Sequence, residues 1–443
     1  MLPRTRRNNT IRERVLDLVS IAVIGAGARG LEYMSFVKYF HKKEAEIVAV
    51  CDYNPTRLAE AAKRFKLPAD NCFADEDDFF GAGRLADAIF ICTQDKSHYG
   101  HALKAIDAGY KNMMLEKPVS NSIPECELLA HKARVNGVNL VVCHVLRYSN
   151  YYKKIKSILR SGELGDIVTI NHIESIAYFH FAHSFVRGNW HNEAASNPSL
   201  LAKCCHDIDL LQWFMNAACK SVSSIGSLSY FKKENAPEGA AKRCLDGCKV
   251  KVNCPYDAER LYIKDPFYKA TFIKYMGREL TDKLKSSKTE KYEALKTGDY
   301  GKCVYYCDND VADHQTVTMD FGGGKTAVHT MSAFTDKMFR KTHITCAKGE
   351  IIGQDNESKI TVNIFGKGGK KVRTKVISFS GHVEGDFRLI TSFIKLVNGT
   401  LENKEDVTFI DATIPSHRII MAAEESRHNG GVPVEIGDSC TYH

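Results

Sequence analysis

The sequence predicts an α/β domain followed by an α+β domain. The first is of the Rossmann type, and the second is an open, mostly antiparallel β-sheet with helices on one face. In the first third of the 443-residue chain, short apolar runs alternate with helical patterns, which is typical of βαβ units and a parallel sheet. From about residue 313, β-rich runs follow one another, which indicates an antiparallel sheet. We therefore expect an N-terminal extension at 1–19, the Rossmann domain at 20–145 and the second domain at 146–443.

The first domain contains short apolar runs separated by segments with helical spacing. The helical patterns cover Pro55–Phe65 and His98–Ala108. Because the runs are nearly continuous in apolar residues, we expect strands that are buried on both faces, as in a parallel sheet covered by helices. The predicted strands are Ser20–Ile24, Ile47–Cys51, Ala88–Cys92, Asn112–Leu115 and Leu140–Val145.

The rhythm changes after residue 150. A helix is predicted at Tyr151–Ser161, a strand at Ile167–Ile173 and a second helix at Asp207–Phe214. Two closing helices, Asp386–Val397 and Ile414–Arg427, are expected to cover one face of the second sheet. The later strands of that sheet are predicted at Gln315–Phe321, Thr326–Ala333, His343–Cys346, Ile360–Phe365 and Val372–Phe379.

Composition narrows the class of protein. A hydrophobic fraction of 44% and a charged fraction of 26% are those of an ordinary globular protein. The net charge of +8 is spread along the chain and forms no basic stripe, so no nucleic-acid partner is expected. The N-terminus has no long apolar stretch, so we expect neither a secretory signal nor a membrane span. The 15 cysteines are odd in number, and several lie in apolar runs, which favours a reducing, cytoplasmic location.

A glycine turn of the form G-x-G-x-x-G follows the first predicted strand directly. Such a turn lets the backbone approach a pyrophosphate closely, and the next helix points its N–H groups at the phosphates. Asp52 ends the second strand, 22 residues after Gly30, where a carboxylate can accept hydrogen bonds from ribose hydroxyls. Because no basic residue stands directly beside Asp52, NAD is favoured over NADP. The predicted cofactor-binding residues here are Gly25, Gly27, Ala28, Arg29, Gly30 and Asp52.

A second motif places Glu116-Lys117-Pro118 at the end of a strand. With the glycine turn, the loop Thr93–His98, Ser161–Gly165 and Ala422–Ser426, it gives the chain a resemblance to the Gfo/Idh/MocA family of sugar and inositol dehydrogenases, over residues 19 to 436. The resemblance implies an open antiparallel sheet whose bare face forms homo-oligomers. It implies a cis Lys117–Pro118 bond and a catalytic Lys117 that contacts substrate and nicotinamide ribose. It also adds Thr93, His98, Glu116 and Lys117 to the cofactor site.

The family's second signature is a helix that carries Asp and, four residues later, a catalytic His. In this chain His206 matches the histidine, but the Asp position is occupied by Ala202. Lys203, Asp207 or Asp209 could compensate for the missing carboxylate. Histidine suits the reaction, because oxidising an alcohol requires a base that titrates near neutrality. A lysine beside it can stabilise the developing alkoxide. The predicted substrate-binding residues at the domain junction are His144, Arg147, Tyr148 and Asp209.

Within the family, Cys204–Asp207 and the cysteine-rich stretches around Arg243–Cys254 and Cys303–Asp310 resemble a branch that includes glycoside 3-dehydrogenases. The resemblance implies an NAD-dependent oxidoreductase that acts on a sugar or glycoside hydroxyl, such as the one at C3. An NAD-dependent glycosidase that oxidises its substrate transiently is the first alternative. A catalytically silent NAD-sensing or scaffold protein is the second, kept open by Ala202.

A charged, cysteine-rich segment at about 232–312 looks like an insertion. Its apolar runs are short, so it buries little surface, and cytosolic disulfides are rare. Thiolates around a structural Zn²⁺ or an iron–sulfur cluster could supply the missing folding energy. The spacing matches neither standard pattern, and simple packing thiols are the alternative. The predicted ligands are Cys244, Cys248, Cys254 and one of Cys303 and Cys307, with Cys307 preferred.

Overall fold

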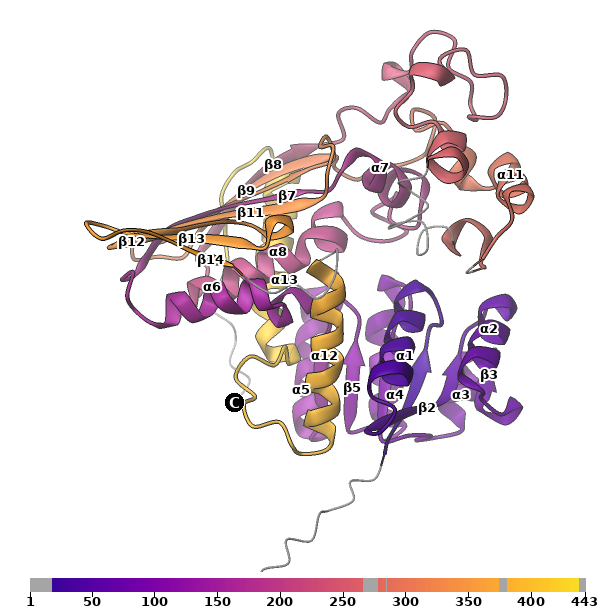
Figure 1. The fold of residues 1–443 in the computed structure, drawn as a ribbon, viewed down its shortest axis with the longest axis horizontal. Helices are drawn as coiled ribbons and strands as arrows, with labels where there is room; N and C mark the ends of the chain where they lie inside the picture. Colours follow the sequence, from indigo (N-terminus) through magenta and orange to yellow (C-terminus); the bar gives the residue numbers. More distant parts are fainter. Residues whose placement is uncertain (1–17, 266–277, 284, 374–380, 438–443) are drawn as a thin grey trace, which may run out of the picture.

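The computed structural model describes residues 18–265, 278–283, 285–373 and 381–437, and it contains the two expected domains (Figure 1). Most of the expected N-terminal extension lies outside the described residues. So does the end of the last predicted strand, Val372–Phe379, beyond residue 373.

The first domain is a six-stranded parallel sheet in the order β3-β2-β1-β4-β5-β6. All five predicted strands are present, and the two-residue β3 is an addition. The strand order reverses between β1 and β4, and ligands of such sheets bind outside the carboxyl ends of the strands at that point. The strands are β1 (Val19–Ile24), β2 (Ala45–Cys51), β3 (Cys72–Phe73), β4 (Ala88–Ile91), β5 (Asn112–Leu115) and β6 (Asn139–Val142).

Helices cover both faces of this sheet, which explains the continuous apolar character of its strands: every residue of β4 is buried. The side chains of Asn54 and Asp75 cap the helices α2 and α3 by accepting hydrogen bonds from backbone N–H groups of the first turn. The helices are α1 (Ala28–Phe40), α2 (Pro55–Phe65), α3 (Glu76–Gly81), α4 (His98–Asp107) and α5 (Ile123–Val135).

The second domain is a nine-stranded sheet in the order β14-β13-β12-β11-β7-β10-β9-β8-β15. All neighbouring strands are antiparallel except β7 and β10, which confirms the predicted mostly antiparallel sheet. β8, β12 and β15 were not predicted. The strands are β7 (Ile167–Ser175), β8 (Ser221–Ser227), β9 (His314–Asp320), β10 (Thr326–Ser332), β11 (Phe339–Cys346), β12 (Gly349–Gln354), β13 (Lys359–Ile364), β14 (Gly368–Arg373) and β15 (Val434–Glu435).

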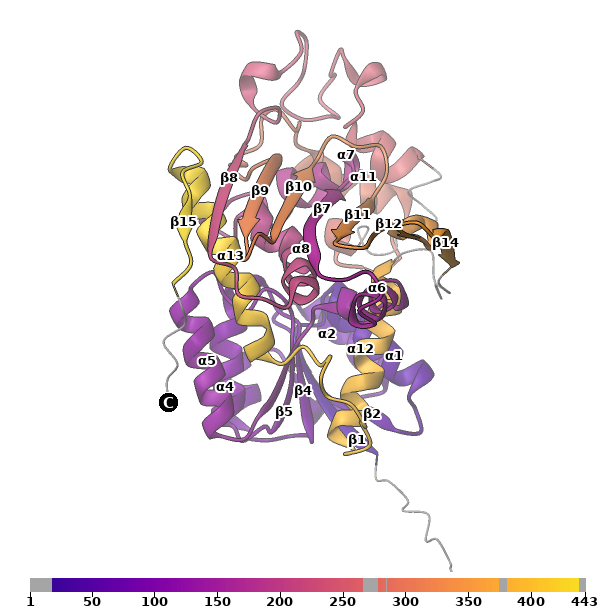
Figure 2. The same ribbon diagram turned by 90° about the vertical axis from the view of Figure 1, so that its left-hand side faces the viewer.

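Three helices, α6 (Asn150–Arg160), α8 (Ser199–Met215) and α13 (Ile410–His428), lie between this sheet and the Rossmann domain (Figure 2). Their apolar side chains form one core with the inner face of the sheet. The expectation for the other closing helix, α12 (Gly381–Val397), is wrong. Its Leu389 and Phe393 pack with β1 and α1 of the Rossmann domain, because its apolar stripe completes the core on that face.

Residues 228–313 connect β8 to β9, which are neighbours in the sheet, so this stretch is an insertion between two adjacent strands. It contains turns, short helical segments and α11 (Lys288–Thr297), and its own apolar cluster is small. The insertion reaches over the side of the Rossmann domain that carries α2 (Figure 1). Its placement there brings one of its side chains onto the glycine turn.

Candidate active site

The glycine turn joins β1 to α1 at the point where the strand order reverses. Gly25 has a φ of +92°, and a Cβ there would lie 2.5 Å from the carbonyl oxygen of Cys92. A Cβ on Gly30 would collide with the carbonyl oxygen of Gly25, whereas one on Gly27 would meet nothing within 4 Å. The space in front of Gly27 is therefore open. α1 begins there at Ala28 with no capping side chain and no acidic residue in its first turn, so it offers its N–H groups to an anion.

Asp52 lies at the end of β2 and is held against the glycine turn. One carboxylate oxygen accepts a hydrogen bond from the backbone N–H of Ala26 at 2.7 Å, and the other accepts one from Asn54 at 2.8 Å. The side chain is nearly buried. Asp52 thus lies beside the glycine turn at the carboxyl ends of the strands, where ligands bind in sheets of this type.

The structure adds a residue that the sequence did not single out. Arg278 of the insertion is only 2% exposed and donates a hydrogen bond from Nη2 to the carbonyl oxygen of Ala26 at 2.8 Å. Its Nε and Nη1 atoms are buried and have no hydrogen-bond partner among the described residues. Nearby, Arg57 of α2 pairs with Asp282 of the insertion at 2.6 Å. Two guanidinium groups thus come close to Asp52, although none stands beside it in the sequence.

Lys117 follows β5 and reaches across to α8. The Lys117–Pro118 bond is cis, as predicted, and Nζ of Lys117 donates a hydrogen bond to the carbonyl oxygen of Ala202 at 2.7 Å. Ala202 and His206 are four residues apart on α8 and share one face of that helix. The structure therefore brings the two predicted catalytic residues to one place. At the position of the family Asp, a backbone carbonyl takes the lysine's hydrogen bond.

His144 completes this group of side chains. Its ring lies edge-on to the ring of His206 at 5.7 Å between centroids, and it is fully buried. Neither ring nitrogen of His144 has a hydrogen-bond partner among the described residues. Burial, together with the charges of Arg147 and Lys117, lowers the pKa of His144 well below its usual range, so it stays neutral. The nearest carboxylate oxygen, from Asp209, lies 3.8 Å from Nδ1, which is beyond hydrogen-bond distance. The imidazole beside His206 therefore keeps its hydrogen-bonding capacity.

The side chains of several other predicted cofactor residues are held by neighbouring residues. Arg29 forms ion pairs with Glu32, Glu116 and Asp386, which ties α1 to α12. Glu116 accepts from Arg29 and from the hydroxyl of Tyr33, so its carboxylate is already in use. Burial opposes its ionisation, but the charges of Arg29 and Lys117 prevail and lower the pKa of Glu116. Only the backbone of Arg29 remains available to a dinucleotide.

The loop after β4 is fixed in the same way. The two ring nitrogens of His98 lie 2.6 Å from the carbonyl oxygen of Pro118 and 3.0 Å from that of Thr93. The hydroxyl of Thr93 contacts His101 at 2.9 Å. Asp95, which was not predicted, accepts hydrogen bonds from Trp190 and Asn197 of the second domain. This loop therefore joins the two domains next to the glycine turn.

The remaining predicted substrate residues serve the domain junction. Arg147 and Asp209 form a buried ion pair with a hydrogen bond of 2.6 Å. The hydroxyl of Tyr148 lies 3.0 Å from that of Thr408, inside the core beneath α12. We assign these three residues to positioning. His144 is the member of the predicted substrate set that faces His206.

Two of the suggested substitutes for the missing family Asp are engaged elsewhere. Asp207 accepts hydrogen bonds from His172 at 2.8 Å and from Arg340 at 2.6 Å. Lys203 pairs with Glu174 at 3.1 Å. Both belong to a buried polar layer between α8 and the sheet. With Asp209 paired to Arg147, none of the three replaces the carboxylate next to His206.

Comparison with known proteins now decides the family. The oxidoreductase family profile described as "NAD-binding Rossmann fold" matches residues 19–144, and the profile described as "C-terminal alpha/beta domain" matches residues 156–436. The chain belongs to the Gfo/Idh/MocA oxidoreductase family. The comparisons therefore identify this chain as an NAD-binding oxidoreductase of that family.

Individual members of the family are distant. YteT of Bacillus subtilis, described as an oxidoreductase, is 24% identical over 53% of this chain and 56% of its own length. Inositol 2-dehydrogenase of Salmonella paratyphi B is 24% identical over 48% of this chain and 61% of its own. The matches thus span about half of those relatives. The structure of an inositol dehydrogenase homolog with NAD⁺ from Azotobacter vinelandii has a TM-score of 0.67 at 16% identity, covering 95% of this chain and 98% of that one. This likeness concerns the fold.

The insertion gathers four cysteines around one small cavity of about 10 Å³. Its lining includes Cys244, Cys248, Cys254 and Cys303. Cys307, the preferred fourth ligand of the sequence analysis, is not among the residues that line this cavity, and its thiol points at the carbonyl oxygen of Cys303 at 3.4 Å. The reason is local: Arg243 and Lys302 form a β-bridge, which sets Cys244 beside Cys303.

A second, larger cavity of about 860 Å³ lies at the C-terminal end of α8, between α5, α6 and α13. It is lined by Trp213 and by several arginines and acids, most of them paired with one another, such as Arg418 with Glu127. Ala202 and His206 stand in the first half of α8 and do not line this cavity.

In the part of the chain that the structure describes, no helix is long and apolar enough to cross a membrane.

Proposed function

We propose that this protein is an NAD-dependent dehydrogenase that oxidises a hydroxyl group of a sugar, an inositol or a glycoside. The observation that carries the proposal is the position of Lys117. Its ammonium group contacts α8 one helical turn before His206, at the carboxyl end of the parallel sheet. This contact supports a base and a cation that act together beside the nicotinamide of a bound dinucleotide.

The proposed roles follow from the residue types. When bound, NAD⁺ would supply the acceptor for the hydride that leaves the carbon. His206 takes the proton of the hydroxyl group as general base. Lys117 donates a hydrogen bond to the same oxygen and stabilises the negative charge that develops there. His144, which is neutral, offers a second hydrogen-bonding group to a neighbouring hydroxyl of the substrate.

The nucleotide end of the site fits the same cofactor. The open space in front of Gly27 and the uncapped start of α1 suit a pyrophosphate. Asp52 would accept hydrogen bonds from the adenosine ribose. Arg278, whose Nε and Nη1 have no hydrogen-bond partner among the described residues, would donate to a phosphate oxygen of the dinucleotide. The carboxylate of Asp52 favours NAD over NADP, and the nearby guanidinium groups of Arg57 and Arg278 limit that preference.

We also propose that the protein works in the cytoplasm as a homo-oligomer of two or more copies of this chain. The outer face of the second sheet carries exposed apolar side chains, among them Val168 and Ile225, which a second copy would cover. Light scattering of the purified chain tests this, and a monomer at micromolar concentration would contradict it.

A panel of polyols, sugars and glycosides with NAD⁺ and with NADP⁺ tests the activity. We expect steady formation of reduced cofactor with at least one member of the panel, and a product two hydrogens lighter by mass. Cleavage of a glycoside without net reduced cofactor would instead support a glycosidase that uses NAD transiently. Tight binding of NAD⁺ without turnover of any compound would favour a sensing or scaffold role.

A further inference from the structure

The cavity in the insertion is built by three chain segments that meet there. Backbone hydrogen bonds from Cys244 to Gly301 and from Cys303 to Lys242 hold two of the segments together at 3.0 and 2.9 Å. The third segment carries Cys248 and Cys254 in two tight turns. Four thiols from distant positions thus face one space, in a segment that has only a small apolar cluster of its own.

The sulfur atoms are also supported by N–H groups. The backbone N–H of Tyr256 donates to the sulfur of Cys254, and that of Tyr305 donates to the sulfur of Cys303. In both cases the donor lies two residues after the cysteine. Hydrogen bonds to sulfur stabilise thiolates that ligate a metal and tune the metal centre.

Arg187 provides independent evidence that an anion belongs here. Its side chain is 3% exposed and donates to the sulfur of Cys244 at 3.6 Å, to the carbonyl oxygen of Tyr256 and to that of Lys302. Among the described residues it forms no ion pair with a carboxylate, and its Nη1 has no hydrogen-bond partner. A buried cation without a counter-charge is costly. Four neutral thiols would not supply that charge, whereas four thiolates around a metal centre would.

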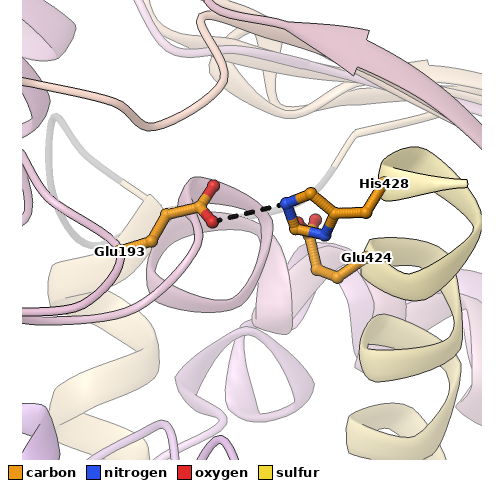
Figure 3. Close-up of side chains that lie close together, drawn as sticks. All are labelled: Glu193, Glu424 and His428. Carbon is orange, nitrogen blue, oxygen red and sulfur yellow. Dashed lines mark ion pairs between the residues drawn. The ribbon is translucent and has the colours of Figure 1, made fainter.

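The dimensions of the site distinguish two kinds of centre. A single Zn²⁺ with Zn–S bonds of about 2.3 Å would hold the four sulfurs about 3.8 Å apart and leave no space between them. Among the described residues, the one group of three potential ligands within 4.8 Å of one another is Glu193, Glu424 and His428 (Figure 3). The cysteines are therefore set more widely, around a cavity that accepts a water-sized sphere. An iron–sulfur core separates its four thiolates further than a single ion does.

The group in Figure 3 does not compete as a metal site. Arg427 already pairs with Glu193 and with Glu424 at 2.7 Å each, so both carboxylates are neutralised by a cation of the protein itself.

We infer that the insertion holds a four-cysteine iron–sulfur cluster ligated by Cys244, Cys248, Cys254 and Cys303, with Arg187 as its buried counter-charge. The cluster is structural. It joins the segments of the insertion that the apolar cluster alone does not hold, and the same insertion carries Arg278 to the glycine turn. The inference does not depend on the proposed dehydrogenase activity.

The test is the metal content of the full chain purified without oxygen and without chelators. We expect about four iron and four acid-labile sulfide per chain, with the visible absorption of a thiolate-ligated cluster. Cys244→Ser and Cys254→Ser should lose iron, whereas the matched Cys307→Ser variant should keep it. About one zinc per chain and no iron would overturn the inference in favour of a single ion. Metal-free protein whose four thiols react freely in the folded state would leave only packing cysteines.

Because a serine variant can fail to fold, the unmutated protein gives the primary result, and its iron content is independent of any enzyme assay. Arg187→Met offers a second measurement. Loss of the counter-charge should make the cluster easier to remove with a chelator, whereas Arg187→Lys should keep part of the protection. Equal rates of iron loss in all three proteins would exclude Arg187 as the counter-charge.

Discussion

The catalytic end and the nucleotide end of the site are built in different ways. At the catalytic end, Lys117 follows a buried strand and His206 stands in a long buried helix, so packed elements fix both side chains. At the nucleotide end, Asp52 follows a strand in the same manner, but Arg278 comes from an insertion with little regular structure. The first end is held by packed strands and helices, while the second depends partly on the long connection between β8 and β9.

This difference separates the expected consequences of mutation. A change of His206 at the catalytic end should affect the chemical step and leave the binding of the dinucleotide nearly unchanged. A change at the nucleotide end should affect affinity for the dinucleotide and leave turnover at saturation nearly unchanged. A variant that changed both kcat and the affinity for the dinucleotide by large factors would contradict this division between the two ends.

The largest effect is expected at the catalytic end. Lys117→Ala and His206→Ala should each lower kcat by about 10²–10⁴-fold, because each removes a positioned acid–base or charge-stabilising group. Binding of NAD⁺, measured by calorimetry, should survive His206→Ala. His206→Asn serves as the matched variant of similar shape. Turnover within a few-fold of normal in either alanine variant would remove that residue from the proposed mechanism.

At the nucleotide end, Asp52→Ala should raise KM for NAD⁺ by about 10–100-fold, the range for losing hydrogen bonds to a charged group. It should also improve the use of NADP⁺, since the carboxylate no longer repels a 2′-phosphate while Arg57 and Arg278 remain close. Steady-state kinetics with both cofactors measure this. Equal affinities for the two cofactors in the unmutated protein would contradict the proposed preference.

Arg278→Ala should raise KM for NAD⁺ by about 10-fold, as expected for one charge-assisted hydrogen bond, with kcat nearly unchanged. Asp282→Ala is the matched control, because it breaks the ion pair between the insertion and Arg57 of α2 without touching the glycine turn. If Arg278 only helps to dock the insertion, the two variants should behave alike. A normal KM in Arg278→Ala would exclude the proposed contact with the phosphate.

The same contrast explains what could be predicted from the sequence. The strands of the Rossmann sheet, the cis Lys117–Pro118 bond and the pairing of Lys117 with the helix of His206 follow from apolar patterns and short motifs. Arg278 carries no such signal: it is one basic residue in a lysine-rich segment, and only tertiary contacts reveal that it is buried on Ala26.

What the sequence does not reveal has a similar origin. The apolar stripe of α12 predicts that this helix packs against a sheet, but it does not predict which sheet. In the structure α12 packs on the Rossmann domain. Glu116 and His98 lie in cofactor motifs, yet their polar atoms are taken by Arg29, Tyr33 and backbone carbonyls. A motif locates a residue along the chain, whereas the direction of its side chain depends on partners that are distant in the sequence.

The smallest expected effect is on stability at low pH, and it concerns the buried polar layer between α8 and the sheet of the second domain. His329 of β10 is fully buried, stacks on the ring of His172 and has no hydrogen-bond partner among the described residues. Burial lowers its pKa to about 3. In the unfolded chain a histidine takes up its proton near pH 6.5, so between these values the unfolded state binds the extra proton. The stability contributed by neutral His329 is therefore complete above about pH 6.5 and is lost as the pH falls towards 3.

Urea unfolding at several pH values between about 7 and 5 measures this, with an expected loss of about 1.4 kcal/mol per pH unit from this group. His329→Gln should remove that part of the slope, even if the variant is less stable at neutral pH, because glutamine does not titrate. If the His329 variant and the unmutated protein lose stability in parallel as the pH falls, the buried layer under α8 does not carry this acid sensitivity. The helix that carries His206 would then owe none of its loss of stability at low pH to His329.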